Sequence, residues 1–470
     1  MSAIAESGGR GAPALLSYRS LRRTRAVARL GRVTLVALAV LGVYAEGRGL
    51  GPHGFLPVAL LSGVWLLALR LGRVSTPEPL GPGVATVLGG LAGLVLVPAA
   101  AVWIPFVQLS PARLLVMAGA VIASVGVWDY AVHRTTAARR RVLVIGSATV
   151  ADAVANDTSR AAAPVDVVGL VPESGEAAEC VRVPVVGELD ALADVVAALS
   201  PDVVVVGDGI ECDATIDRLL EVPDDGFRIV GFTSFFEHAV GRVPVSTLRA
   251  SWFMSLLDLR QPSYARWAKR GFDVAAAAVA LVLAAPVMAL VALLLVPSGS
   301  VLYRQTRLGQ RGRRFMIVKF RTMRDGAEAP GRALWSGHDD PRVTRLGRVL
   351  RRAHLDELPQ LVNVLRGDMS MVGPRPERPE FVELLEREVP FWHRRLLVKP
   401  GVTGWAQLRG GYASDCEAMA EKLSYDLWYL RNRSVLVDLA ICLATALRML
   451  SGLVPARPCS DSDPAPAEAR

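Results

Sequence analysis

Two adjacent carboxylates, Asp356 and Glu357, are the residues of this chain best suited to chemistry. Pro359 follows them, and proline is tolerated in the first turn of a helix, so we expect a helix to begin here with Asp356 near its N-cap. Apolar residues then recur at helical spacing until Arg366-Gly367 ends the run. The N–H groups of a helix N-terminus would keep both carboxylates ionised. Ionised carboxylates can bind Mg²⁺ or attack phosphorus.

Arginine is unusually dense around this pair, at Arg348, Arg351, Arg352, Arg366, Arg375 and Arg378. Arg375 stands between two prolines, which restrict its backbone, and guanidinium groups match phosphate oxygens. Lys319 and Arg321 add two further cations that could bind phosphate. The pattern predicts phosphoryl transfer from a doubly charged donor. Taken alone, the carboxylate pair is more simply interpreted as a helix cap, and the cations as solvated surface charge.

Six sequence blocks, in a fixed order, indicate the protein family to which this site could belong. The blocks are KRGFD (269–273), RQTRLGQRGRRF (304–315), KFRTM (319–323), DPRVTRLGRVLRRAHLDELPQL (340–361), GDMSMVGPRPE (367–377) and KPGVTGWAQLRG (399–410). Together they closely resemble the bacterial sugar transferases that act as polyprenyl-phosphate glycosyl-1-phosphate transferases. The resemblance covers roughly residues 269–453 and is highly specific.

The resemblance implies an activity and a set of roles. The enzyme would transfer a sugar 1-phosphate from a UDP-sugar to polyprenyl (undecaprenyl) phosphate, the first membrane step of exopolysaccharide or O-antigen-type glycan assembly. Asp356 would attack the sugar-bearing phosphorus and hold the phosphosugar covalently while UMP leaves, with Mg²⁺ near Asp356 and Glu357 orienting groups or assisting proton transfer. The phosphates would be clamped by Lys319, Arg321, Arg351 and Arg375. A direct displacement, with Asp356 acting as a metal ligand alone, stays open.

Two residues of the last block could shape the sugar or nucleotide pocket. These are Trp405 and Gln407. Trp405 is equally well interpreted as an anchor at the membrane interface.

Composition narrows the class of protein. The chain has 470 residues, of which 52% are hydrophobic, so we expect membrane helices as well as soluble parts. The net charge of +9 is mostly arginine placed beside apolar runs, which suits anionic lipid and phosphate substrates. Because no nucleic-acid-binding motif accompanies this charge, we expect no nucleic-acid partner. The five cysteines lack metal-site spacing and indicate reduced thiols.

The first third of the chain predicts a membrane domain. A basic arm over residues 1–32 precedes four transmembrane helices over 33–135, in the apolar segments at about 33–45, 55–69, 84–107 and 114–132. Arginine is more frequent in the arm and in the loops near 70–83 and 134–141 than in the other loops. The positive-inside rule therefore places the N-terminus in the cytoplasm and returns the chain there.

Residues 140–250 predict a Rossmann-like α/β module, because short apolar strands alternate with helical stretches. The turn after the first strand, beginning at Gly146, lacks the second glycine of a dinucleotide site, so we expect no bound dinucleotide. A nucleotide-sugar dehydratase would also need a Tyr-x-x-x-Lys pair, which this module lacks. The resemblance favours a regulatory or self-association role, including homo-oligomer formation. A chain starting near Gln261 is therefore expected to stay active.

Residues 272–296 form an apolar run long enough to cross a bilayer, within a catalytic domain predicted over 262–454. Pro286 lies in its middle and arginine or lysine flanks both ends, from Lys269 to Arg304. These features and the family resemblance favour a re-entrant helix, broken at Pro286, over a kinked span. Residues 435–453 indicate an amphipathic helix on the membrane surface, and 455–470 a disordered tail.

The sequence thus predicts a multi-pass protein of the inner (plasma) membrane, mixed α and α/β. It would combine a four-helix transmembrane bundle, a Rossmann-like module and a mostly helical, membrane-embedded catalytic domain on the cytoplasmic face. The alternative is a non-catalytic membrane scaffold that recruits glycan-assembly enzymes. A scaffold would have no physical need for Asp356, Glu357 and Arg375 together.

Overall fold

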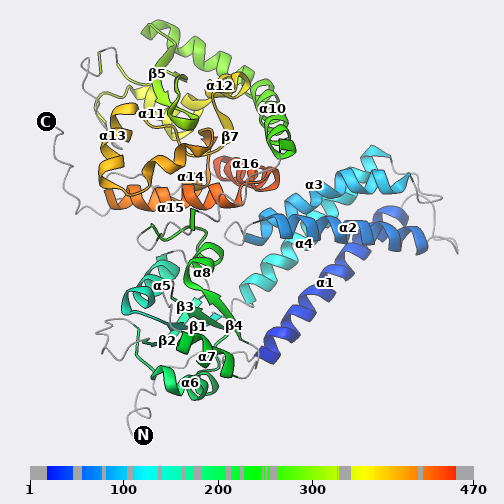
Figure 1. Cartoon of the computed structure of the whole chain (residues 1–470). Helices are drawn as coiled ribbons and strands as arrows, with labels where there is room; N and C mark the ends of the chain where they lie inside the picture. Colours follow the sequence, from blue (N-terminus) through cyan, green and yellow to red (C-terminus); the bar gives the residue numbers. More distant parts are fainter. Residues whose placement is uncertain are drawn as a thin grey trace. The chain divides into compact units, whose positions relative to one another are not determined.

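The computed structural model describes residues 18–45, 55–76, 81–102, 110–135, 140–160, 165–172, 183–207, 213–222, 227–245, 248, 252–253, 263–324, 326–327, 340–410 and 416–450. The chain divides into two compact units, Met1–Val240 and Gly241–Arg470. Helices and an α/β sheet both occur, as expected (Figure 1).

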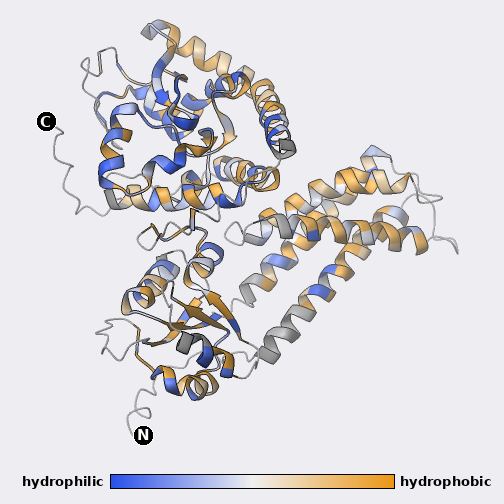
Figure 2. Cartoon of the chain, in the orientation of Figure 1, coloured by the Kyte–Doolittle hydropathy of each residue, from blue (hydrophilic) through white to orange (hydrophobic). Residues whose placement is uncertain are grey.

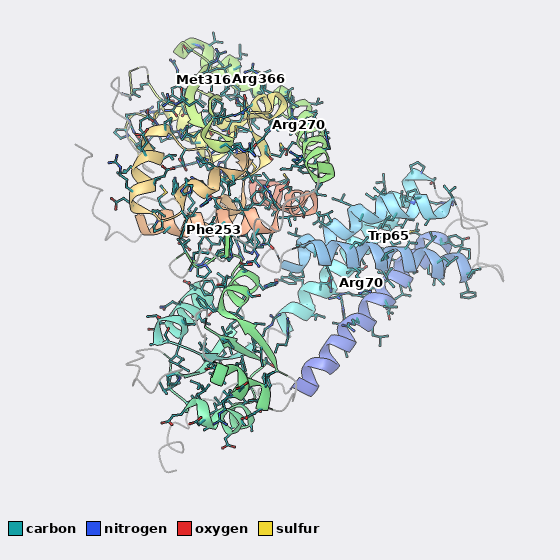
Figure 3. All side chains as sticks on the ribbon, in the orientation of Figure 1. Trp65, Arg70, Phe253, Arg270, Met316 and Arg366 are labelled. Carbon is teal, nitrogen blue, oxygen red and sulfur yellow. The ribbon has the colours of Figure 1, made fainter. Side chains whose placement is uncertain are left out.

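The first unit opens with four long helices: α1 (Tyr18–Ala45), α2 (Phe55–Ser75), α3 (Gly81–Ala101) and α4 (Pro111–Thr135). They pack against one another, with α1 and α3 each contacting both α2 and α4. Trp65 is fully buried among them (Figure 3), and Gly93 lies against its ring. In the described part of the chain, these helices and α10 are the five that are long and apolar enough to cross a membrane (Figure 2).

Helix α1 includes part of the segment predicted as a basic arm. It begins at Tyr18, inside the segment expected to be a basic arm over 1–32. Arginine has a high helix propensity, so a run of arginines can extend the apolar helix that follows it. The C-terminal end of the predicted segment 84–107 lies outside the described residues.

A carboxylate near the end of α4 ties these helices together. Asp129 is buried and accepts hydrogen bonds from Arg32 Nε (2.6 Å), from Arg73 and from the Thr86 hydroxyl (3.0 Å). These donors come from α1, α2 and α3. Asp129, which belongs to α4, therefore links all four helices. Its paired donors compensate the cost of burying a carboxylate.

The α/β part of the first unit is an open sheet of four parallel strands in the order β2-β1-β3-β4. Its elements are β1 (Arg140–Ile145), α5 (Ala148–Arg160), β2 (Val165–Val171), η2 (Leu189–Ala191), α6 (Leu192–Leu199), β3 (Val203–Val206), α7 (Asp213–Glu221), β4 (Arg228–Gly231) and α8 (Phe232–Ala239). Val142 and Val144 belong to the apolar cluster with α5 and α8, whereas Leu143 and Ile145 belong to the cluster with α6 and α7. Because strand side chains alternate, both faces of the sheet are apolar and covered by helices.

The second unit is mostly helical. Its elements are α10 (Ser263–Leu295), η4 (Val296–Ser298), β5 (Leu302–Leu308), η5 (Gln310–Gly312), β6 (Arg314–Phe320), α11 (Arg345–Arg352), η6 (Leu355–Glu357), α12 (Gln360–Arg366), β7 (Ser370–Val372), α13 (Pro379–Glu388), η7 (Trp392–Leu397), β8 (Gly401–Thr403), α14 (Trp405–Arg409), α15 (Cys416–Asn432) and α16 (Val435–Leu450). Strands β5 and β6 form an antiparallel hairpin, and β7 pairs with β8 in parallel.

Helix α10 bends and packs on the unit with both of its ends (Figure 1). Ala277 joins the apolar cluster of Ile317 and Leu361, while Val291 joins that of Phe320. A straight helix would place Ala277 and Val291 roughly 20 Å apart, but Ile317 and Phe320 are separated by roughly 10 Å along β6. Helical structure continues through Pro286, so the predicted break is a bend. The side chains between the two contacts are largely exposed and apolar (Figure 2).

The unit also includes residues that we predicted to belong to the α/β module or its linker. The Gly241 carbonyl accepts a hydrogen bond from Trp405 Nε1 (2.6 Å), and Val243 N donates to the Ser424 carbonyl (3.1 Å). Phe253 packs on Phe391, with ring centroids 4.8 Å apart. The second unit therefore begins at Gly241, earlier than the predicted limits of 250 and 262, because this segment packs on α14, α15 and η7.

Candidate active site

The site forms where three separate segments meet. Lys319 comes from the end of β6, Glu357 from η6 and Arg375 from the loop after β7. Lys319 Nζ lies 2.9 Å from Glu357 Oε1, and an Arg375 guanidinium nitrogen lies 2.9 Å from the same oxygen. Two predicted cations, Lys319 and Arg375, thus form ion pairs with the same oxygen of the predicted carboxylate Glu357.

The turn that carries the carboxylates differs from the prediction. His354 adopts φ 53° and opens a separate 3-10 turn over Leu355–Glu357, whereas α12 begins at Gln360. The amides of Leu358 and Leu361 donate to carbonyls three residues back, those of Leu355 (3.3 Å) and Leu358 (3.1 Å), so this stretch has 3-10 hydrogen bonding before α12 begins. The carboxylates are therefore not held ionised by the N–H groups of a helix. For Glu357, side-chain cations take that role.

Glu357 is the ionised partner of the pair. Burial by itself would raise its pKa, but the charges of Arg375 and Lys319 and their hydrogen bonds outweigh burial. The pKa of Glu357 is consequently held well below its ordinary value of 4.5. Burial in turn lowers the pKa of Lys319, although the charge of Glu357 opposes this effect.

Asp356 lies in a different electrostatic environment. Its relative exposure is 8%, and its carboxylate accepts no hydrogen bond and forms no ion pair at bonding distance with the described residues. Burial and the charge of Glu357 raise its pKa, while the charges of Lys319, Arg351 and Arg375 act in the opposite direction. Two neighbouring carboxylates thus differ in kind: Glu357 is neutralised by cations, and Asp356 stays available to a reaction partner.

The loop that carries Arg375 is fixed by its backbone. The carbonyls of Pro374, Arg375 and Pro376 accept hydrogen bonds from Gly401 N (2.9 Å), Arg395 (3.1 Å) and Arg307 (3.2 Å), in that order. Each contact holds one residue of the Pro-Arg-Pro run. The guanidinium of Arg375 is therefore aimed at Glu357 by main-chain contacts, in addition to its own ion pair.

A buried ion network supports this loop. Glu377 Oε1 accepts from Lys422 Nζ (2.8 Å) and lies 3.6 Å from Arg395, which also pairs with Asp426 (2.7 Å). Burial would raise the pKa of Glu377, but the charges of Lys422 and Arg395 lower it to about 2. Arg395, Lys422 and Asp426 were not predicted from the sequence, because they lie outside the motif and converge on it only in the fold.

Arg351 is close to the carboxylates without being bonded to them. Its Nε donates to the Thr322 hydroxyl (2.9 Å), and its charge acts on Asp356. Arg321, predicted to act with Lys319, lies elsewhere: its guanidinium is beside Gly299, at the end of α10. Lys319, Arg351 and Arg375 therefore lie near the two carboxylates, whereas Arg321 lies beside Gly299.

The two predicted pocket residues lie in α14. Trp405 is buried, stacks on Trp428 at 4.8 Å and donates to the Gly241 carbonyl. It therefore packs in the interior of the unit. The side-chain nitrogen of Gln407 is buried and has no hydrogen-bond partner within the described residues, so it could serve a bound molecule.

Helix α10 is fastened to the site by its N-terminal arm. Arg270 donates to the carbonyls of Val364 and Leu365 at the C-terminal end of α12, at 2.7 Å each (Figure 3). Asp273 accepts from Lys269 (3.0 Å) and from the Ser370 hydroxyl (3.0 Å). A cation at a helix C-terminus satisfies exposed carbonyls, so Arg270 joins α10 directly to α12.

The described residues thus include five helices long and apolar enough to cross a membrane, and a buried aspartate close to lysine and arginine. The family model of the bacterial sugar transferases matches residues 264–452. The chain belongs to this family.

Named relatives share the same region. A UDP-N-acetylgalactosamine-undecaprenyl-phosphate N-acetylgalactosaminephosphotransferase of Aeromonas hydrophila is 42% identical over 218 residues, which are 46% of this chain and 51% of the relative. A UDP-glucose:undecaprenyl-phosphate glucose-1-phosphate transferase of Caulobacter vibrioides is 44% identical over 187 residues, 39% of this chain and 70% of the relative. An exopolysaccharide production protein of Rhizobium leguminosarum is 41% identical and is covered over 95% of its length, by 39% of this chain. The chain thus spans about half the length of the Aeromonas relative.

Proposed function

We propose that this protein transfers a sugar 1-phosphate from a UDP-sugar to undecaprenyl phosphate and so starts exopolysaccharide or O-antigen-type glycan assembly. The observation that carries the proposal is the contrast between Glu357, paired with two cations, and Asp356, buried beside it without a bonded partner among the residues that the structure describes. Family membership and the printed names of the relatives support the same reaction class.

The proposed reaction has two displacements at one phosphorus. A carboxylate oxygen of Asp356 attacks the sugar-bearing phosphorus, the bond from that phosphorus to the bridging oxygen breaks, and UMP leaves with the electron pair. An oxygen of undecaprenyl phosphate then attacks the same phosphorus. The Asp356 carboxylate is released, and the product is a lipid diphosphosugar.

The surrounding cations would stabilise the charge of this reaction. Lys319 and Arg375, which hold Glu357, would also face the donor's diphosphate, and Arg351 would act from the side of Thr322. Fixed cations in a site that excludes water stabilise developing charge without reorganising. Glu357 would keep Lys319 and Arg375 in place.

Mg²⁺ is the proposed cofactor. Within the described residues, no group of three or more His, Cys, Asp or Glu side chains could hold a metal ion. Mg²⁺ commonly uses one or two carboxylates and takes its other oxygens from water and substrate phosphates, so the single available carboxylate of Asp356 fits it. When bound, the ion would neutralise charge on the diphosphate.

The test of the function is a direct assay. Membranes that contain the chain are incubated with Mg²⁺, undecaprenyl phosphate and a panel of UDP-sugars, and the release of UMP is measured. The relatives are named for N-acetylgalactosamine and for glucose, so both UDP-sugars belong in the panel. Absence of UMP release and of lipid product with every sugar would favour the scaffold alternative.

We further propose that α10 is re-entrant and that the second unit acts at the cytoplasmic face of the inner membrane. The bend, the two packed ends and the cationic flanks support this topology. Sending either flank outward would violate the positive-inside rule.

Cysteine labelling tests this topology. Lys269 is engaged by two carboxylates, so the exposed neighbour Trp267 (78% exposed) is the better position on that flank, with Arg304 on the other. Single cysteines at these two positions, in a cysteine-free chain, should resist a membrane-impermeant thiol reagent in intact cells and react after lysis. Labelling at position 304 from outside would show a fifth span. Pro286→Leu should straighten α10, expose position 304 to the reagent and abolish UMP release.

The boundary of the second unit gives a second prediction. A chain beginning at Gly241 should keep UMP release close to that of the full chain, because the site residues described above all lie in the second unit. A chain beginning near Gln261 should unfold at a lower temperature, since Trp405 Nε1 loses its buried acceptor, at a cost of about 1–3 kcal/mol. Unfolding midpoints in detergent measure the difference. Equal midpoints for the two truncated chains would contradict it.

A further inference from the structure

A pocket of about 410 Å³ lies at the C-terminal end of α10. Its lining includes neither Glu357 nor the two cations paired with it. It is lined by Leu294, Leu295, Pro297, Arg321, Met323, Arg324, Thr344 and Leu346. Its volume falls within the range of ligand pockets, roughly 300–1,000 Å³. None of these lining residues is acidic. The pocket therefore combines an apolar wall with two guanidinium groups.

The apolar wall continues onto the exposed surface of α10. Leu290, Leu293 and Leu294 are 56%, 68% and 52% exposed, and Val296 follows them at 59%. Large apolar side chains exposed side by side at the end of a membrane-length helix are suited to lipid. A chain of hydrocarbon could pass from the bilayer along this surface into the pocket.

The backbone makes room for one of the arginines. Gly299 has φ +99°, and a Cβ atom at this position would lie 3.1 Å from a guanidinium nitrogen of Arg321. The Arg321 amide also donates to the Val301 carbonyl (3.0 Å). The backbone conformation therefore favours a glycine, and the absence of a Cβ atom leaves room for the Arg321 guanidinium beside the end of α10.

The pocket adjoins the reactive carboxylate through a short chain of contacts. Thr322, between the lining residues Arg321 and Met323, accepts from Arg351, whose charge acts on Asp356. The lining residues Leu295 and Leu346 belong to the same apolar cluster as Leu355, the neighbour of Asp356 in sequence. The pocket therefore lies close to the turn that carries Asp356.

We propose that this pocket binds the acceptor, with Arg321 and Arg324 holding the phosphate of undecaprenyl phosphate and the apolar wall holding the first part of its chain. The inference rests on the proposed function and assigns a binding pocket to its acceptor substrate. A phosphate monoester carries a charge of about −1.5 to −2 at neutral pH, which matches two guanidinium groups, whereas a phospholipid diester carries one charge. The charge of the pocket therefore favours the monoester.

Steady-state kinetics of the full chain in nanodiscs test the proposal. Arg321→Gln and Arg324→Gln should each raise the KM for undecaprenyl phosphate by about tenfold or more, because each removes charge-assisted hydrogen bonds, and should leave the KM for the UDP-sugar within about twofold. The matched control is Arg348→Gln, an exposed arginine of α11 that does not line the pocket. An unchanged acceptor KM in both pocket variants would overturn the proposal.

Binding of the lipid separates this inference from the proposed function. Native mass spectrometry of the full chain with undecaprenyl phosphate should show one bound lipid, reduced in both variants and retained in the control. This readout holds even if the chain releases no UMP, the result that would instead overturn the function. If phosphatidylglycerol binds as well as undecaprenyl phosphate and is lost in the same variants, the pocket holds a phospholipid headgroup and the proposal fails.

Discussion

Asp356→Asn is expected to abolish sugar-phosphate transfer, reducing UMP release by at least about 10⁴-fold, the scale seen when a nucleophile is removed from an enzyme. Asparagine preserves the shape of the side chain but is a poor nucleophile and supplies no negative charge. Because Asp356 has no bonded partner in the described part of the chain, its loss should leave the Lys319–Glu357–Arg375 cluster intact. The unfolding midpoint should stay close to that of the wild type.

Two comparisons sharpen this prediction. Wild-type protein, quenched after mixing with labelled UDP-sugar in the absence of acceptor, should retain labelled phosphosugar, and Asp356→Asn should retain none. Glu383→Gln, an exposed carboxylate of α13, is the control and should behave like the wild type in both measurements. Undiminished UMP release by Asp356→Asn would rule out the aspartyl intermediate. Label retained by that variant would place the nucleophile elsewhere.

Glu357→Gln is expected to have the second-largest effect, lowering turnover by about 10²-fold or more and destabilising the fold by about 3 kcal/mol. The substitution leaves Lys319 buried without its counter-ion and removes one of the contacts that hold the Arg375 side chain, which is 41% exposed. The depressed pKa of Glu357 stabilises the fold fully above pH 4.5, its ordinary value, and this stabilisation is lost as pH falls toward the folded-state pKa. Glu357→Gln should therefore be destabilised at neutral pH, which thermal unfolding measures.

A double variant separates the two effects. Lys319→Met combined with Glu357→Gln removes both partners of the buried pair, so it should recover part of the lost stability without recovering turnover. The residual turnover of Glu357→Gln should also be measured as a function of pH. Its fall on the acidic side, the acid limb of the profile, should occur at lower pH than in the wild type, because the charge of Glu357 raises the pKa of Asp356. An acid limb that stays in place would mean that a group other than Asp356 controls it.

Much of the site could be predicted from the sequence because its reactive groups lie in short, ordered blocks. Asp356 and Glu357 are neighbours, Arg375 is held between prolines, and Lys319 belongs to a compact motif. The structure brings Glu357, Lys319 and Arg375 together within hydrogen-bond distance. Hydropathy likewise located the five membrane-length helices, since their apolar runs are properties of single segments.

Local reasoning was less successful where a property depends on neighbours from elsewhere in the chain. It placed Asp356 at the N-terminus of an α-helix, although Asp356 lies in a 3-10 turn that precedes α12. It grouped Arg321 with Lys319, although the close approach to Gly299 puts its guanidinium at the end of α10. It ended the α/β module too late, because the packing of Gly241 against Trp405 has no signal in either segment alone.

The sequence by itself determined which groups can react and which segments are apolar, because both are properties of residue type and short-range order. The tertiary structure alone decided how the two carboxylates differ. Two cations from distant segments neutralise Glu357, while burial leaves Asp356 with a raised pKa and no bonded partner among the described residues. It also decided that Arg395, Lys422 and Asp426 support the loop of Arg375, since such buried ion pairs arise only when helices far apart in sequence are packed together.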